Sequence, residues 1–380
     1  MPKLLTYCAT FLKREMLHVY RQVSAIDEFE QWIVTRRREN AQHFPFNNLI
    51  ELKKSRFRGF RRACFRLFGL PVPLDGYETK QLEMLVASLK IDIFHAYLGT
   101  EAARLLAFFK RTRCAKVVSF HGNDLSDSLS QTDFCGLLAH TDLFLVRSQS
   151  LANALIERGC PPERIRLNRT GIPIPEITRA IEFPDSRIRL LQACRFIEKK
   201  GLDVTLEALS LLKNQGYTVD LDLAGAGPEE AKLRNLANDL GIAKQVHFLG
   251  FLTNADLLAR LPDYHLFVHP SRTTDSGDRE GIPNSLLEAM AVGLPVISTR
   301  HSGIPEVISD GDNGYLIPAA DPAMLAKAIV HLLEQGAEDF RRVSNNARKT
   351  VIDQYSTAAN RQSLQASYKE AIALAKIRQY

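Results

Sequence analysis

Two glutamates stand eight positions apart at the start of an expected helix in the second half of the chain. Glu280 opens the run EGIPNSLLEAMAVGLP, and Glu288 lies more than one turn inside it. Eight residues at the helical rise span at most about 12 Å, close to the reach from a sugar ring past a diphosphate to a ribose. Because a carboxylate accepts hydrogen bonds from a vicinal diol, we expect Glu288 on ribose hydroxyls and Glu280 on a transferred sugar. The alternative is an amphipathic helix with two surface glutamates.

The residues between these glutamates are those of a helix start. Pro283 suits the first turn of a helix, and Gly293 suits its end. The backbone around Gly281, Ile282 and Asn284 then presents N–H groups at the positive end of the helix dipole. Such a start is a ready site for a diphosphate. Residues 281–284, Pro283 included, are therefore predicted to bind the phosphates of a nucleotide.

A basic turn follows the expected strand IRLLQAC. It reads RFIEKKG and contains Arg195, Lys199 and Lys200, followed by Gly201. Two cations at a strand end, beside a glycine that permits close backbone approach, suit a leaving diphosphate. A solvated basic turn is the alternative interpretation.

Three other strand ends carry weaker signals. His121 and Asp124 follow the strand KVVSF, and His95 ends IDIFH. A histidine in such a place is usually structural, but His121 is a candidate for contact with a ligand. Gly225 and Gly227 follow TVDLDLA without the third glycine and ribose-binding acid of a dinucleotide fingerprint. We interpret that pair as a tight strand-to-helix turn.

The run EGIPNSLLEAMAVGLPVISTRHSGIPEVISDGDNGYLIP closely resembles the C-terminal signature of glycosyltransferase family 4, the retaining nucleotide-sugar transferases of GT-B fold. The resemblance covers most of 188–335 and is closest to the branch that builds exopolysaccharide and other surface glycans. It is thinner in the first half, where DIFHAYLGTEAARLL and VVSFHGNDL are similar to the family's strand ends. It implies that Arg195 and Lys200 hold the leaving diphosphate, with Lys199 a bystander or substitute. It also implies that His121 lies near the transferred sugar.

Two loops bear on the same resemblance. Many members of the family have a glycine-rich loop after the first strand, but residues 9–14 here read ATFLKR, without glycine. The side of the donor site formed by the first domain is therefore left unspecified. The resemblance also implies that residues 250–253 supply backbone contacts to the nucleotide base.

Short apolar strands alternate with amphipathic helices along the whole chain, which predicts α/β architecture with parallel sheets. Ligands of such sheets bind beyond the carboxyl ends of the strands, where the motifs above fall. We expect two facing Rossmann-like, doubly wound domains of the GT-B type with a cleft between them. The expected divisions are an N-terminal acceptor-side domain at 1–172, a linker at 173–187, a nucleotide-sugar-binding domain at 188–355, and a C-terminal helix at 356–380 that caps the second domain or crosses back to the first.

Composition places the chain among globular proteins, with 45% hydrophobic and 24% charged residues in 380. No apolar run approaches the roughly 20 residues that a bilayer span needs.

The six cysteines lack zinc spacing and are expected to be reduced thiols of a cytosolic protein. Charge is uneven: residues 1–170 carry 26 Lys and Arg against 17 Asp and Glu. The first half is thus expected to meet an anionic partner.

Much of this basic excess lies in residues 53–68, which hold seven cations and no acid. Phe57, Phe60, Cys64 and Phe68 recur at near-helical spacing with arginines beside them. This pattern favours an interfacial helix on an anionic membrane surface. An ordinary helix with a solvated basic face remains open, and no nucleic-acid partner is expected.

Together these features predict a retaining hexosyltransferase that moves sugar from a UDP- or GDP-sugar to a glycan or lipid-linked acceptor in surface polysaccharide biosynthesis. Neither metal nor cofactor is expected, because cations and a helix dipole stabilise the leaving diphosphate. The Asp220 and Asp222 carboxylates lie inside a strand pattern and are interpreted as structural. The expected location is cytoplasmic, at the inner face of the plasma membrane. A nucleotide-sugar epimerase of the same fold and a degenerate nucleotide-sugar-binding subunit are the alternatives.

Overall fold

The structure is a computed structural model of the 380-residue chain. It describes residues 1–13, 16–55, 65, 74–121, 125, 129–176, 180–275, 277 and 281–378. The chain divides into two compact units. Unit 1 contains residues 1–171 and 357–380, and unit 2 contains residues 172–356.

Unit 1 is built on a seven-stranded sheet in the order β3-β2-β1-β4-β5-β6-β7, with every pairing parallel. The order reverses between β1 and β4, so their carboxyl ends define the switch point at which doubly wound sheets bind ligands. The strands are β1 (Lys3–Cys8), β2 (Glu30–Thr35), β3 (Leu49–Glu51), β4 (Ile93–Tyr97), β5 (Ala115–Phe120), β6 (Leu143–Val146) and β7 (Ile165–Leu167). The helices are α1 (Leu17–Ser24), α3 (Gly76–Leu89), α4 (Gly99–Ala103), α5 (Leu106–Arg111), α6 (Gln131–His140), α7 (Gln149–Glu157) and α14 (Thr357–Ile377).

Unit 2 repeats the same arrangement with a six-stranded parallel sheet in the order β10-β9-β8-β11-β12-β13. Here the switch point lies between β8 and β11. The strands are β8 (Arg187–Ala193), β9 (Thr218–Ala224), β10 (Val246–Gly250), β11 (Leu266–His269), β12 (Val296–Thr299) and β13 (Tyr315–Ile317). The helices are α8 (Leu202–Asn214), α9 (Glu230–Asp239), α10 (Asn254–Arg260), α11 (Asn284–Ala291), α12 (Pro322–Glu334) and α13 (Gly336–Tyr355).

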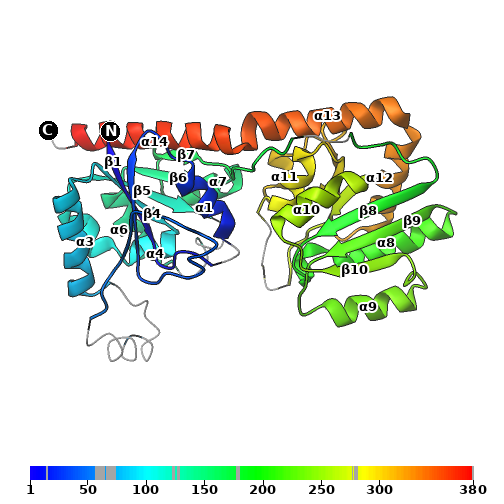
Figure 1. Cartoon of the computed structure of the whole chain (residues 1–380), viewed down its shortest axis with the longest axis horizontal. Helices are drawn as coiled ribbons and strands as arrows, with labels where there is room; N and C mark the ends of the chain where they lie inside the picture. Colours follow the sequence, from blue (N-terminus) through cyan, green and yellow to red (C-terminus); the bar gives the residue numbers. More distant parts are fainter. Residues whose placement is uncertain are drawn as a thin grey trace. The chain divides into compact units, whose positions relative to one another are not determined.

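These two sheets confirm the predicted class of two Rossmann-like, doubly wound parallel domains (Figure 1). The central strands are buried on both faces, since helices cover both. β5 is buried at all six positions, and β11 and β12 are buried at all four. No described helix is both long and apolar enough to span a membrane.

The last helix, α14, closes one face of the unit 1 sheet (Figure 1). Leu364, Tyr368 and Ala371 pack in one apolar cluster with residues of β1, β4, β5 and β6. The Tyr368 hydroxyl lies 2.7 Å from His95 Nδ1, and Ser119 Oγ lies 2.6 Å from Nε2 of the same ring. His95 is therefore a fully buried structural histidine whose two ring nitrogens both contact protein groups.

The burial of His95 predicts a pH-dependent stability for unit 1. Burial lowers the pKa of His95 to about 3, against about 6.5 in an unfolded chain. Below pH 6.5 the unfolded state therefore binds a proton that the native state rejects, and stability falls as pH falls toward 3. At pH 5 this one residue is expected to cost about 2 kcal/mol relative to pH 7.5.

The measurement is urea unfolding at pH 7.5 and 5.0, followed by the fluorescence of Trp32, the single tryptophan, which lies in β2. His95→Asn should reduce the pH dependence by the share of His95, whereas replacement of the exposed His247 should leave it intact. An unchanged slope in His95→Asn would refute this explanation.

Candidate active site

The basic turn of unit 2 lies directly beyond the carboxyl end of β8, at the switch point. Arg195 is exposed, and Lys199 and Lys200 are half-buried at the end of a single 3₁₀ turn. Gln192, fully buried on β8, donates from Nε2 to the Lys200 carbonyl at 2.8 Å and accepts from Thr205 at 2.7 Å. The backbone that carries Lys200 is thus fixed from inside the domain.

A second set of contacts holds this turn against the end of β11. The Arg272 N–H donates to the Lys199 carbonyl at 3.0 Å. The Arg272 guanidinium makes two bonds to the Asp203 carboxylate, at 3.0 and 2.9 Å, in the first turn of α8. Gly201 has φ +63°, and a Cβ there would lie 2.1 Å from the Pro270 carbonyl oxygen. The glycine thus permits close approach as predicted, but the neighbour in this structure is protein backbone.

The start of α11 is anchored beside the same strand. Ser285 Oγ donates to the carbonyl of Ala193, the last residue of β8, at 2.7 Å. The first bond inside the helix runs from the Leu287 N–H to the Pro283 carbonyl at 3.3 Å. The N–H groups of Asn284 and Ser285 therefore precede the helical ladder, which gives this end its positive dipole. Pro283 is the N-cap residue, one position earlier than the first-turn placement that the sequence suggested.

Glu288 lies on the second turn of α11 and is 6% exposed. Its Oε1 accepts a hydrogen bond from Asn254 Nδ2 at 2.7 Å, and Asn254 is the first residue of α10. This contact joins α11 to the start of α10, the helix that follows β10. A buried carboxylate held by an amide is oriented as an acceptor, which suits contact with a diol.

The Gly225–Gly227 turn is confirmed as a structural device. A Cβ at Gly225 would lie 1.9 Å from the Cys194 carbonyl oxygen, and one at Gly227 would lie 2.3 Å from the Phe196 carbonyl oxygen. The turn therefore packs against the backbone of the basic turn. The two glycines therefore fix the position of the basic turn from the β9 side of β8, opposite to the contacts of Arg272 on the β11 side.

The paired aspartates of β9 are also structural. Asp220 forms an ion pair with Arg187 at 2.8 Å, and Asp222 accepts a 2.6 Å hydrogen bond from the Tyr264 hydroxyl. Each carboxylate has its own protein partner. The structural interpretation of this pair is confirmed.

In unit 1, His121 follows β5 at the carboxyl edge of the sheet. Its ring lies 5.5 Å from the ring of His18 on α1 and 5.5 Å from that of Tyr97 at the end of β4. Burial, with smaller effects of Arg147, His18 and His95, lowers the pKa of His121 well below its ordinary value. The imidazole is therefore neutral at physiological pH.

The glycine-free loop after β1 has a packing explanation. Phe11 and Leu12 are fully buried in an apolar cluster with residues of β1, α1 and β4. The Phe11 N–H donates to the Arg37 carbonyl at 2.9 Å, and the Phe11 carbonyl accepts from Glu39 at 2.7 Å. The loop thus extends the pairing of β1 with the chain after β2, a conformation that needs no glycine.

Several predicted residues lie outside the described part of the chain. They are Glu280, Asp124 and most of 53–68. Within the described residues, Arg195 and Lys200 follow β8 directly, and the start of α11, which carries Asn284, is hydrogen-bonded to the last residue of β8 through Ser285. Glu288 lies one turn further along α11. His121 belongs to unit 1.

Four supporting residues escaped the sequence analysis. Asn254, Gln192 and Arg272 contact predicted site residues in unit 2, and His18 does so in unit 1. For Asn254 a signal existed, because Thr253 caps α10 in the T-x-x-D pattern that marks a helix start. The other three depend on contacts between distant segments.

Comparison with known proteins shows the family and the fold of the chain. The model of "Glycosyl transferases group 1" matches residues 173–350, and that of "Glycosyltransferase Family 4" matches residues 26–174. The structure of Anabaena Alr3699/HepE in complex with UDP superposes with a TM-score of 0.74 over 97% of this chain and all of that one, at 17% identity. That likeness shows a shared GT-B fold.

Two curated relatives are closer in sequence. WcaL of Salmonella typhimurium, named for colanic acid biosynthesis, is 36% identical over 281 residues, which are 71% of this chain and 69% of the relative. AmsK of Erwinia amylovora, an amylovoran biosynthesis glycosyltransferase, is 38% identical over 68% of this chain and 65% of its own length. The chain belongs to the family 4 glycosyltransferases, whose C-terminal half is the group 1 domain.

Proposed function

We propose that this glycosyltransferase moves a hexose, with retention, from a nucleotide-diphosphate sugar to a glycan or lipid-linked acceptor in surface polysaccharide synthesis. The observation that carries the proposal is the geometry around β8. The basic turn, held by Gln192 and Arg272, and the start of α11, held by Ser285, both lie at one strand end. Relatives named for colanic acid and amylovoran synthesis support the acceptor class, and a structural neighbour solved with UDP supports the donor class.

In the proposed mechanism the bond from the anomeric carbon to the diphosphate breaks as an oxocarbenium-like centre develops. Arg195, Lys200 and the start of α11 stabilise the charge that forms on the leaving phosphate. The departing phosphate takes the proton of the acceptor hydroxyl, which attacks from the same face. The Glu288 carboxylate accepts hydrogen bonds from the ribose hydroxyls, and the Glu280 carboxylate accepts a hydrogen bond from a hydroxyl of the sugar. His121, neutral at working pH, hydrogen-bonds the transferred sugar.

These cations take the place of a metal ion in the proposal. Activity should therefore persist in excess EDTA. A strict requirement for added divalent cation would show that Arg195 and Lys200 do not suffice.

Residues 53–68 are proposed to dock unit 1 on an anionic membrane surface from the cytoplasm. Their seven cations without an acid support this part of the proposal. Where described, the segment is tied to α3, because Gln81 accepts from the Lys53 N–H at 2.9 Å and donates to its carbonyl at 3.0 Å. Co-sedimentation with vesicles that contain anionic lipid tests it.

The activity is tested by incubating the protein with radiolabelled UDP- and GDP-sugars and a lipid extract of a polysaccharide-producing bacterium. We expect label in a glycoside product from one nucleotide class. Release of an isomerised nucleotide sugar would indicate an epimerase. Binding of the donor without any turnover would indicate a degenerate subunit.

A further inference from the structure

Unit 2 contains a cavity of about 350 Å³ at the edge of its sheet opposite to the proposed donor site. Three of its lining residues fix its place: Arg187 is the first residue of β8, Thr218 is the first residue of β9, and Gln245 directly precedes β10. The cavity therefore lies at the amino ends of these strands, and at 3.3 Å per residue it is separated by about 20 Å from the carboxyl end of β8. We call it the amino-edge cavity.

Positive charge dominates the lining of the amino-edge cavity. Arg187, Lys213 and Lys244 contribute three cations to it, and Asp220 contributes one carboxylate. Arg187 Nε lies 2.8 Å from Asp220 Oδ2, so these two residues neutralise each other. The charges of Lys213 and Lys244 are left without a counter-charge among the lining residues. A cleft lined by charge of one sign raises the local concentration of ions of the opposite sign.

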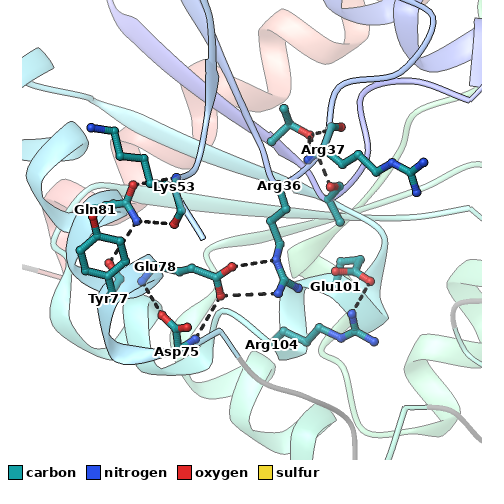
Figure 2. A network of polar contacts seen from close by, with 11 residues as sticks. Arg36, Arg37, Lys53, Asp75, Tyr77, Glu78, Gln81, Glu101 and Arg104 are labelled. Carbon is teal, nitrogen blue, oxygen red and sulfur yellow. Dashed lines mark hydrogen bonds and ion pairs between the residues drawn. The ribbon is translucent and has the colours of Figure 1, made fainter. Parts of the chain in front are cut away.

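The buried charged cluster of unit 1 shows the opposite arrangement. Arg36 donates to both carboxylate oxygens of Glu78, at 3.2 and 3.5 Å (Figure 2). Arg104 forms an ion pair with Glu101 at 3.0 Å in the same cluster. Each of these two arginines thus has its own carboxylate, whereas the amino-edge cavity keeps an excess of two positive charges.

Both lysines belong to the same wall of the cavity. Lys213 lies in the last turn of α8, and its Nζ donates to the Gly241 carbonyl at 2.6 Å. Lys244 lies three residues after Gly241, in the loop that leads into β10. Lys244 forms no ion pair or hydrogen bond with any residue that the structure describes. Since an ammonium has three donors, all three of Lys244 and two of Lys213 can bind an anion between them.

Neutral side chains beside the lysines add hydrogen-bond donors and an apolar surface. Thr218 is exposed, and Tyr217 is half-buried with its ring against the apolar core of unit 2. Neither hydroxyl has a hydrogen-bond partner in the part of the chain that the structure describes. The cavity thus offers cationic and neutral donors together with one aromatic ring.

These properties fit a phosphate monoester. Its phosphate carries a charge between about −1.5 and −2 at pH 7 and three acceptor oxygens, which match the excess of two positive charges and the surplus of donors. The volume of the cavity lies at the lower end of the range for small-molecule sites, about 300–1,000 Å³. A small organic group beside the phosphate therefore has room, and the ring of Tyr217 gives it an apolar contact.

We propose that the amino-edge cavity is a second ligand site of this protein, which binds a small phosphate monoester. Lys213 and Lys244 hold the phosphate, and the organic group of the ligand lies against Tyr217. The site is separate from the proposed donor chemistry, because α8 begins at the basic turn and Lys213 lies in its last turn. Its ligand therefore binds whether or not the donor site is occupied.

The test is isothermal titration calorimetry of the full chain with phenyl phosphate, phenyl sulfate and inorganic phosphate. Phenyl sulfate keeps the shape of phenyl phosphate but carries a single negative charge. Wild type is compared with Lys213→Gln and with Lys244→Gln, whose side chain has no contact in the described structure that the substitution could break. The matched control is Lys232→Gln, an exposed lysine of α9 that pairs with Glu229. Lys200→Ala reports any probe that binds at the proposed donor site, and thermal unfolding checks that each variant is folded.

A second readout locates the ligand. The protein is labelled with 3-fluorotyrosine, and the ¹⁹F resonance of residue 217 is assigned by its absence in Tyr217→Phe. We expect phenyl phosphate to shift this resonance in wild type and in Lys200→Ala alike.

In the calorimetry, phenyl phosphate should bind wild type, Lys232→Gln and Lys200→Ala with equal affinity. Lys213→Gln and Lys244→Gln should each weaken this binding about 10-fold, the usual effect of losing one charge-assisted hydrogen bond. Phenyl sulfate should bind more weakly because it has less charge, and inorganic phosphate because it lacks the organic group.

Four results would overturn the inference. They are no binding of phenyl phosphate, binding that Lys200→Ala abolishes, a Lys244→Gln variant that binds like the wild type, and equal affinity for phenyl phosphate and either of the other two probes. Loss of folding in Lys213→Gln would leave Lys244→Gln as the deciding variant.

Discussion

Lys200→Ala is expected to lower kcat by about 10²- to 10³-fold, the usual cost of removing one group that stabilises developing charge. Lys200 ends the 3₁₀ turn beyond β8, and Gln192 fixes its carbonyl from inside the domain. The backbone bond survives the substitution, so the loss is confined to the ammonium group. The measurement is steady-state transfer or donor hydrolysis with the nucleotide sugar that the protein binds.

The neighbouring lysine supplies a demanding comparison. Lys199→Ala should lower kcat less than 10-fold if Lys200 carries the diphosphate contact. Lys232→Ala, which removes an exposed lysine paired with Glu229 on α9, should leave kcat unchanged. Equal losses of kcat in Lys199→Ala and Lys200→Ala would show that the turn acts through its overall positive charge. A normal kcat in Lys200→Ala would show that Lys200 does not stabilise the leaving diphosphate.

Gly225→Ala is expected to destabilise unit 2 by about 3 kcal/mol or more. Two causes act together. Gly225 has φ +141°, a conformation that residues with a side chain rarely adopt, and the added Cβ would meet the Cys194 carbonyl oxygen at 1.9 Å. Relief of that clash must move the backbone of the basic turn, so donor affinity should fall with stability. Thermal unfolding and UDP titration of the variant measure both effects.

Gly216→Ala separates the two causes. Gly216 has φ +90°, but a Cβ there would meet no atom within 4 Å. It should cost only the conformational strain, about 1–2 kcal/mol, and leave UDP affinity unchanged. If the two variants were equally stable, close packing of the turn against Cys194 would not be what holds it.

The strand pattern was predictable because most strands here are buried on both faces. Ten apolar runs of the sequence predict strands, and all ten are strands in the structure, with ends that differ by at most two residues: KLLTYCAT, IDIFHAY, KVVSFHG, DLFLVRS, IRLLQAC, TVDLDLAG, QVHFLG, YHLFVHPS, PVISTR and GYLIP. The missed strands have physical reasons. β3 (Leu49–Glu51) and β7 (Ile165–Leu167) are three-residue edge strands, too short to show a period. β2 (Glu30–Thr35) begins with two polar residues, Glu30 and Gln31, which shorten its apolar run.

The residues that carry the proposed chemistry could be predicted from their local spacing in the sequence. The residues that hold them in place could not. Arg195, Lys200 and Glu288 stand in short motifs whose residue types indicate their chemistry. Arg272 and Asn254 could not be assigned, because they meet Asp203 and Glu288 across 69 and 34 positions of the chain. The same holds for the Arg36–Glu78 pair, which spans 42 positions. Only the folded sheet brings such residues together.

The central claim, a nucleotide-sugar donor site at the carboxyl end of β8, is tested most directly by nucleotide binding to wild type and Glu288→Gln. Gln keeps the acceptor for Asn254 but replaces the second oxygen with a donor, which cannot accept a ribose hydroxyl. The matched control is Glu207→Gln, an exposed glutamate of α8.

Thermal unfolding is followed with UDP, GDP and ADP at saturating concentration. A ligand at 100 times its Kd stabilises the native state by about 2.7 kcal/mol. We predict that UDP or GDP raises the Tm of wild type and Glu207→Gln by several degrees, and that Glu288→Gln loses this shift while its unliganded Tm stays the same. A wild type whose Tm no nucleotide moves, or a Glu288→Gln variant that responds like the wild type, would contradict the account.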